Sequence, residues 1–426
     1  MNTNTVIDIK AAARGDSPSL QKTQHALSAS TLRRWHLPRA LSVIGVALWS
    51  AASALAQSYS LTQINPPPGA ASSGVADIND QGQVIGNTSV KAGRSNVPGP
   101  AFVWESDVAR VSLPSLPGHP AAQANGISNT GIIVGHSPAL SVYDPAKPPK
   151  AVWWQKNTAT SGTSFYQVGD WNDLLNNPSV LLTEAIAISN DGQFVVFDAK
   201  HPGGDYAAVV AWVAGGTIVK HWVIREGLSD QALPYVLATD ISSNSSTVRV
   251  TGWYELAASN TGAHAFLWEA NYLAAPNAPV VTALDEEPSG HSSHYFTKGL
   301  NGAGELLINK ATRVNGTSVY MSTRFRTTSG TMIDIPTFGG RTSAYSISET
   351  GLVAGTSART GRNVLNHAFL WKQGDTGLTD LNSLKSLPDT SGIELTSALK
   401  INENSQILAY GVRKGVGVRV LLNPAP

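Results

Sequence analysis

The sequence predicts an all-β fold, a seven-bladed β-propeller of four-stranded blades. The prediction depends on one repeated unit, which consists of an AxxI motif, a turn and an apolar run. This unit recurs seven times, about 54 residues apart on average. In addition, no sustained apolar stripe of helical period follows residue 56. Repeated small β units of this length are typical of propellers, in which each sheet packs on its neighbours. The apolar anchors of the seven copies are Ile78, Ile127, Ile188, Ile241, Leu300, Ile347 and Ile401.

Each repeat predicts four short strands in a fixed order. The AxxI strand runs into a turn such as NDQG or SETG, whose Asn and Gly tolerate the positive φ of hairpins, and a second strand such as QVIG follows. A third strand ends in a large residue, as in AFVW (101–104) and in HAFLW (264–268 and 367–371). A fourth strand follows shortly, as in RVSL (110–113) and GLTDL (377–381). We therefore interpret HAFLW as a strand, and its histidines His264 and His367 as hydrogen-bonding residues.

The seventh repeat ends after its third strand, at RVLLNPAP. The missing fourth strand is predicted at residues 59–64, YSLTQI, which would complete the last blade and close the ring. Closure removes an open sheet edge. A linear β-solenoid is the alternative architecture.

The first residues predict export. Arg33, Arg34 and Arg39 precede an apolar run over residues 40–56 that ends in Ala-Leu-Ala. These are the parts of a secretory signal peptide. We expect residues 1–56, which include a long n-region, to be removed, leaving one propeller domain over 57–426 that is secreted or periplasmic. An uncleaved anchor is the alternative, although the run is short for a membrane span, and no later stretch is longer.

Composition excludes several classes of function. The chain has no cysteine and a formal net charge of +1, so it has neither thiol chemistry nor the basic surface of a nucleic-acid-binding protein. No G-x-S-x-G, phosphate loop or H-E-x-x-H motif occurs. The turns lack the ligand spacing of a calcium loop. We therefore assign no catalytic residues, no metal site and no cofactor, and the oligomeric state stays open.

The repeats resemble the HAF repeat of predicted extracellular bacterial proteins. The resemblance rests on AYSISETGLVAG, NHAFLW and LTDL within residues 344–381, and it covers nearly all of residues 59–426. The stretches SSNSS and STRFR depart from the pattern. The resemblance implies export and a repeat fold, and it supplies no catalytic residues.

Ligand-binding candidates are polar or aromatic residues that fall outside the repeat pattern. Aromatic rings beside polar neighbours are typical platforms for sugars or peptides, and titratable residues can act as acids or bases. The leading hypothesis is a non-enzymatic binding module for a glycan or a surface protein. The alternatives are a carbohydrate-active hydrolase or lyase with one site in irregular inter-blade loops, and a structural component of an envelope or matrix. The candidates are Trp171, Trp253, Tyr254, His291 and His294.

Overall fold

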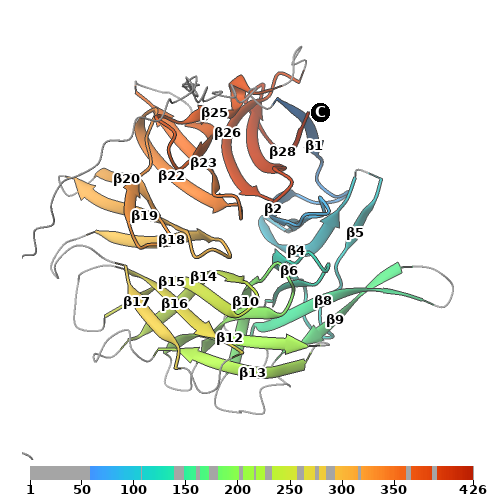
Figure 1. Cartoon of the computed structure of the whole chain (residues 1–426). Helices are drawn as coiled ribbons and strands as arrows, with labels where there is room; N and C mark the ends of the chain where they lie inside the picture. Colours follow the sequence, from blue (N-terminus) through green and yellow to red (C-terminus); the bar gives the residue numbers. More distant parts are fainter. Residues whose placement is uncertain are drawn as a thin grey trace, which may run out of the picture. The chain divides into compact units, whose positions relative to one another are not determined.

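The structure, a computed structural model, is all-β in the part of the chain that it describes (Figure 1). The residues from Ser53 onward form one compact unit. No described helix is long and apolar enough to cross a membrane. The described residues are 58–425, with gaps at 107, 139–147, 160–163, 172–180, 201–204, 215–216, 226–232, 257–262, 274–277, 285–292, 315–317, 361–365 and 386–390. The predicted signal peptide over 1–56 lies outside them.

Most sheets contain four antiparallel strands in simple meander order, as the repeat pattern predicts. Two of these sheets are built from β2 (Ser72–Ile78), β3 (Val84–Ala92), β4 (Ser95–Trp104) and β5 (Arg110–Ser112), and from β6 (Gln123–Ile127), β7 (Ile133–Ser137), β8 (Lys150–Thr158) and β9 (Ser164–Asp170). Two more are built from β18 (His294–Leu300), β19 (Leu306–Val314), β20 (Ser318–Arg326) and β21 (Met332–Asp334), and from β22 (Gly339–Ile347), β23 (Leu352–Arg359), β24 (Asn366–Lys372) and β25 (Thr379–Asp380).

The third and fourth repeats differ from the prediction of separate sheets, because they share one eight-stranded sheet. A single parallel bridge, between Tyr206 and Tyr235, joins the two halves, and the two rings stack with centroids 5.8 Å apart. Each half still has four strands. The halves are β10 (Leu181–Ile188), β11 (Phe194–Lys200), β12 (Tyr206–Ala214) and β13 (Thr217–Ile224), and β14 (Tyr235–Ser243), β15 (Thr247–Glu255), β16 (His264–Asn271) and β17 (Val280–Ala283).

The last sheet combines the two ends of the described chain. It contains β26 (Glu394–Ile401), β27 (Ile407–Arg413), β28 (Val416–Pro424) and, beyond β28, β1 (Tyr59–Ile64). The pairing of β1 with β28 is antiparallel and runs from Tyr59 opposite Pro424 to Ile64 opposite Arg419. Residues 59–64 therefore pair with the seventh repeat, as expected. Tyr59 is fully buried and Ile64 nearly so, because both pack against the neighbouring repeats.

The first strand of each repeat lies nearest a common centre, and the fourth lies outermost, as β6 and β5 or β10 and β13 illustrate (Figure 1). Hydrogen bonds also link the turn after each first strand to the turn of the next repeat. These bonds join Asp80 N to Asn129 Oδ1, Asn129 N to Asn190 O, Ser243 Oγ to Asp191 Oδ2, Asn244 Nδ2 to Gly302 O, Gly302 N to Glu349 Oε2, Glu349 N to Glu403 Oε1, and Glu403 N to Asp80 Oδ1. The final contact connects the seventh repeat to the first. Small sheets packed around a centre in this way are the arrangement of a β-propeller.

The repeat pattern also explains the core. The second strand needs a glycine at this position, because a Cβ at Gly355 would lie 2.7 Å from the ring of Phe369 and would collide with the carbonyl oxygen of Ser343. Gly86 and Gly252 meet the rings of Phe102 and Phe266 in the same way. The aromatic residue of HAF thus covers a glycine on the neighbouring strand. The tryptophans that end the third strands are mostly buried: Trp104, Trp154, Trp268 and Trp371 are each at most 3% exposed.

Candidate functional site

A polar pocket of about 170 Å³ lies where the first strands of the repeats converge. Each of these strands carries a register shift immediately before its apolar anchor, for example between Val75 and Asp77 or between Ala238 and Asp240. Such β-bulges turn a side chain away from the regular alternation. In six of the seven repeats the residue before the anchor therefore lines the pocket instead of entering the core, and in the fifth repeat the anchor Leu300 itself lines it. The six residues are Asp77, Gly126, Ala187, Asp240, Ser346 and Lys400.

Asp77 and Lys400 form an ion pair on the pocket wall. Lys400 Nζ lies 3.4 Å from Asp77 Oδ1, and the two side chains are 33% and 18% exposed, respectively. The other Asp77 oxygen accepts a hydrogen bond from the backbone N–H of Ile127 at 3.1 Å. The neighbouring Asp77 raises the pKa of Lys400, so Lys400 is a charged ammonium group at neutral pH. Asp77 is thus held by Lys400 at one oxygen and by the backbone of Ile127 at the other.

Asp240 is the second carboxyl group of the pocket. Its oxygens accept backbone hydrogen bonds from Ile241 and from Leu300 of the next repeat, each at 2.9 Å. Burial raises the pKa of Asp240 despite these bonds and the positive charge of Lys400. The pocket thus contains a carboxyl group whose pKa is raised by burial, beside the ion pair of Asp77 and Lys400. Burial of a carboxyl group in an active site is one way in which enzymes obtain a general acid.

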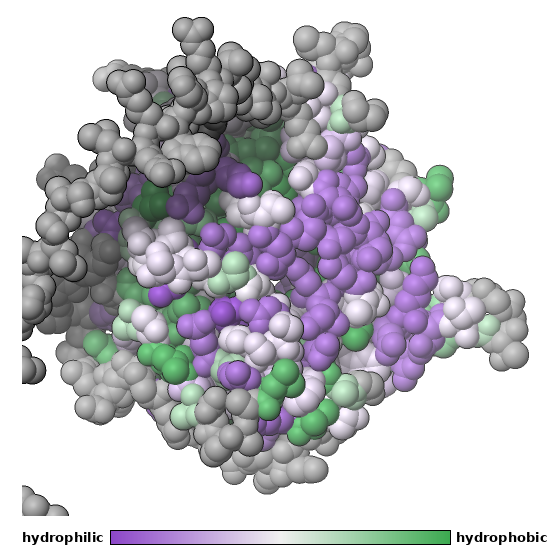
Figure 2. All heavy atoms as spheres, viewed as in Figure 1, coloured by the Kyte–Doolittle hydropathy of each residue, from purple (hydrophilic) through white to green (hydrophobic). Residues whose placement is uncertain are grey.

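Three further acidic side chains stand where the inter-repeat turns border the pocket. Asp80, Glu349 and Glu403 come from the first, sixth and seventh repeats, which are connected by the turn hydrogen bonds. Burial raises the pKa of Glu349, and the nearby charge of Glu403 adds to this shift. Burial and Asp80 raise the pKa of Glu403. These groups make this side of the pocket acidic. Figure 2 shows hydrophilic residues gathered around the centre of the face that it presents.

Another lysine, Lys298, stands two residues before the anchor of β18 and is exposed. Partial desolvation of its ammonium group by the surrounding protein and the charge of Lys400 lower the pKa of Lys298, whereas Asp240 raises it. Among the described residues Lys298 has no hydrogen-bond or ion-pair partner. No group of three or more described His, Asp or Glu side chains could hold a metal ion.

The residues singled out from the sequence lie elsewhere. Trp171 is 1% exposed and packs edge-on against Trp153 and Phe197. Tyr254 is 5% exposed and stacks on His264, with ring centroids 5.2 Å apart. Burial of both side chains leaves little surface for a ligand.

Trp253 and His294 are brought together by a third ring. Phe296 lies edge-to-face with Trp253 at 5.9 Å and parallel to His294 at 6.1 Å. All three side chains are partly exposed. His291 lies outside the described residues, as do the acidic residues at 285–287. Ligand binding by these candidates stays a prediction.

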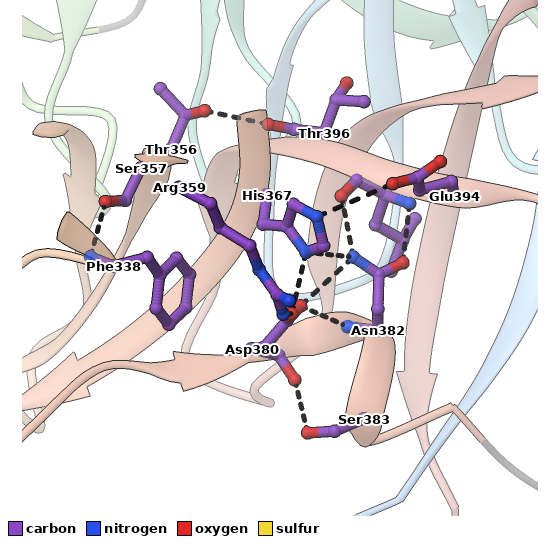
Figure 3. Close-up of polar contacts among 11 residues, drawn as sticks. Phe338, Thr356, Ser357, Arg359, His367, Asp380, Asn382, Ser383, Glu394 and Thr396 are labelled. Atoms are coloured by element: carbon purple, nitrogen blue, oxygen red, sulfur yellow. Dashed lines mark hydrogen bonds and ion pairs between the residues drawn. The ribbon is translucent and has the colours of Figure 1, made fainter. Parts of the chain in front are cut away.

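The histidine of the second HAFLW forms hydrogen bonds near the start of its strand, as expected (Figure 3). His367 Nδ1 lies 2.7 Å from Asp380 Oδ2, and Nε2 lies 3.5 Å from Glu394 on the first strand of the next repeat. Asn382 completes the cluster: its side chain bonds to both the N–H and the carbonyl of Leu395. Burial opposes ionisation of Asp380, but hydrogen bonds from Asn382 and His367 lower its pKa overall. The cluster fastens the sixth repeat to the seventh and lies outside the pocket.

Side chains on the second strand of a repeat also form hydrogen bonds with the backbone of the next repeat. Asn87 donates to the carbonyl of Ala124 and accepts from its N–H, at 2.9 and 2.7 Å. Asn309 makes the same two bonds to Ala344. The paired register puts Asp198 at this position in the third repeat, where it accepts from the N–H of Ala238 while its Oδ1 is buried without a partner. Burial and the charge of Glu184 raise the pKa of Asp198 to about 8. It is therefore a neutral acid at pH 7.

The sequence-based search missed the pocket because it concentrated on irregular loops. The pocket residues occupy the most regular element of the repeat. Aligning the seven copies and comparing the residue before each anchor would have revealed Asp77, Asp240 and Lys400 among glycine, alanine and serine.

No family model and no curated protein matches the sequence. Several solved structures are similar in fold. The propeller domain of a trilobed protease from Pyrococcus furiosus is 9% identical, with a TM-score of 0.45 over 83% of this chain and 96% of that one. The polysaccharide lyase Uly1 is 9% identical, with a TM-score of 0.49 over 88% and 94%. A sialidase from Trypanosoma rangeli is 8% identical, with a TM-score of 0.37 over 86% and 55%.

These findings correct one expectation drawn from the sequence. Regular repeats without a recurrent catalytic set led to the hypothesis of a non-enzymatic binding module. The chains similar in fold include a polysaccharide lyase and a sialidase. The prediction of a non-enzymatic module is wrong. At such low identity the similarities concern the fold alone, and the reaction must be argued from the pocket.

Proposed function

We propose that the chain is a carbohydrate-active enzyme, a hydrolase or a lyase, whose acid–base groups act from the central pocket. The observation that carries the proposal is the placement of Asp240, Asp77 and Lys400 on the walls of one pocket. Cleavage of a glycosidic bond needs a proton donor for the leaving oxygen and a base, which activates water in hydrolysis or removes a proton in elimination. The proposed catalytic site is therefore the central pocket, and not the irregular inter-blade loops in which the sequence led us to expect it.

The two carboxyl groups take different roles in this proposal. Asp240, whose pKa burial raises, holds a proton and donates it to the leaving oxygen. Asp77, which is paired with the ammonium group of Lys400, serves as the base. The pocket in which both groups lie has a volume of about 170 Å³.

Replacing Asp240 by Asn tests the role of the acid. The amide keeps the side-chain shape but cannot donate an acidic proton, so turnover on a panel of polysaccharides should fall ~10²–10⁴-fold. Asp77→Asn should cause a similar loss. Asp191→Asn is the matched control, because Asp191 lies in an inter-repeat turn and bonds to Ser189 and Ser243. Full activity of the Asp240→Asn enzyme, or no turnover of any glycan by the wild type, would contradict the proposal.

We also propose that the sheets form a closed ring of seven four-stranded blades. The seven turn-to-turn hydrogen bonds, which return from Glu403 to Asp80, support closure. The pairing of β1 with β28 supports it as well. The single bridge inside the eight-stranded sheet supports counting that sheet as two blades.

Membership of the HAF-repeat family and export through a signal peptide over residues 1–56 belong to the same proposal. An exported enzyme would meet polysaccharides outside the cytoplasm. N-terminal sequencing of the protein recovered from culture medium or periplasm tests export, with Gln57 as the expected first residue.

A further inference from the structure

One side of β18 presents a line of partly exposed, chemically distinctive side chains. Burial alternates along this strand: His294 and Phe296 are partly exposed and Lys298 is exposed, whereas Tyr295 and Thr297 between them are buried. Alternate residues of a strand share one face. His294, Phe296 and Lys298 therefore form one row, and Lys298 at its end stands two residues before Leu300, which lines the pocket.

Trp253 widens this row. It comes from β15 of the preceding repeat and meets the ring of Phe296 edge-to-face at 5.9 Å. At the equivalent contacts of other repeats the side chains are polar or small. His136 meets Glu184, and Tyr410 faces Gly74. Packing between repeats thus does not require two large aromatic rings here. The two partly exposed rings offer flat apolar area that a ligand can cover.

The positive charge beside these rings favours a ligand with an acidic group. Lys298 has no hydrogen-bond or ion-pair partner among the described residues, and Arg341, an exposed cation, lies on β22, the first strand of the next repeat. Ammonium and guanidinium groups bind carboxylate and sulfate. A flat apolar ring pair, with the exposed Lys298 in the same row as Phe296, matches a sugar ring that carries an acidic group.

We propose that Trp253, Phe296 and Lys298 form a substrate-binding subsite for a glycan that carries carboxylate or sulfate groups. The sugar ring lies on the aromatic pair, and its acidic group pairs with Lys298. This inference rests on the proposed function, because it supplies the substrate class for the reaction at Asp240. It places the neighbouring sugar on the β18 side of the pocket.

Binding is measured separately from turnover so that the two proposals can fail independently. Calorimetric titrations use the Asp240→Asn protein, which should bind without cleaving. The probes are an oligogalacturonate hexamer, a heparin hexasaccharide and uncharged cellohexaose. Binding of at least one acidic probe, with no binding of cellohexaose, is expected. The acidic probe that binds identifies carboxylate or sulfate as the group recognised.

Variants of the subsite give the second readout. In the same background Trp253→Ala and Phe296→Ala should each weaken binding ~10-fold or more, as truncation of a central aromatic contact does. Lys298→Met should weaken binding and flatten its salt dependence, since screening acts on the ion pair. Lys298→Met removes no packing, so it stays informative if an aromatic variant fails to fold.

A matched pair on an outer strand supplies the control. Lys220 lies over the ring of Trp222 on β13, at 4.7 Å from the ring centroid. Trp222→Ala and Lys220→Met should leave binding unchanged. Equal binding of cellohexaose, absence of binding by all three probes, or equal losses in the β13 and β18 variants would overturn the subsite. Cleavage that persists in Asp240→Asn would overturn the proposed function alone.

Discussion

Asp198 occupies the position that Asn87 and Asn309 hold in other repeats, and its chemistry differs from theirs. Asn87 and Asn309 satisfy both backbone groups of the next repeat, whereas Asp198 accepts one bond and leaves Oδ1 unpaired. A protonated carboxyl is the form that fits, because burial and Glu184 raise its pKa to about 8. In the unfolded chain the side chain of Asp198 has the usual aspartate pKa of about 3.9.

Stability should therefore fall as the pH rises from about 4 to about 8, because the folded state holds one more proton over that range. Asp198→Asn removes this dependence and restores the second hydrogen bond. We expect it to raise the melting temperature more at pH 8 than at pH 5. Each unit of difference between the folded and unfolded pKa corresponds to about 1.4 kcal/mol of folding free energy.

Thermal unfolding of both proteins at the two pH values checks this expectation. Asp334→Asn, at an 81% exposed side chain, should show no such pH-dependent gain. An equal gain for Asp198→Asn at pH 5 and pH 8 would mean that the carboxyl titrates alike in both states.

At the scale of elements, the sequence predicted the strands well because their pattern is local. The anchors, the glycine turns and the HAFLW strands all mark elements that the structure contains. The bulge before each anchor could not be predicted, since it depends on pairing with the second strand. Because the bulge turns Asp77 and Lys400 into the pocket, the alternation of apolar residues along the strand does not reveal that they line it. The joined sheet of the third and fourth repeats depends on a contact between Tyr206 and Tyr235, distant in sequence.

The second-strand glycine offers a test at this scale. Gly355→Ala places a methyl group against the ring of Phe369 and the backbone of β22, and should cost about 1–3 kcal/mol of folding free energy. Gly377→Ala is the control, because a Cβ there meets nothing within 4 Å. Chemical denaturation of both variants measures the difference. Equal stability would show that β22 and β23 are not held in this register.

At the scale of the molecule, stability depends on joining the first and last strands. Deletion of residues 57–64 removes the buried side chains of Tyr59 and Ile64 and exposes the edge of β28. We expect a loss of at least ~3 kcal/mol, the cost of emptying a large core site. Denaturation with and without a synthetic YSLTQI-containing peptide measures it, and the peptide should restore part of the loss. An unchanged midpoint for the deleted protein would contradict closure through β1.

The antiparallel register of β1 and β28 also sets how this protein responds to mechanical force. Tyr59 faces Pro424, so the outward ends of the two strands lie at the same end of the ladder. Tension applied through the chain on either side loads the first hydrogen-bonded pair and then each following pair in turn, as in a zipper. A protein tethered by both ends would open here at low force, and one tethered by a single end would not.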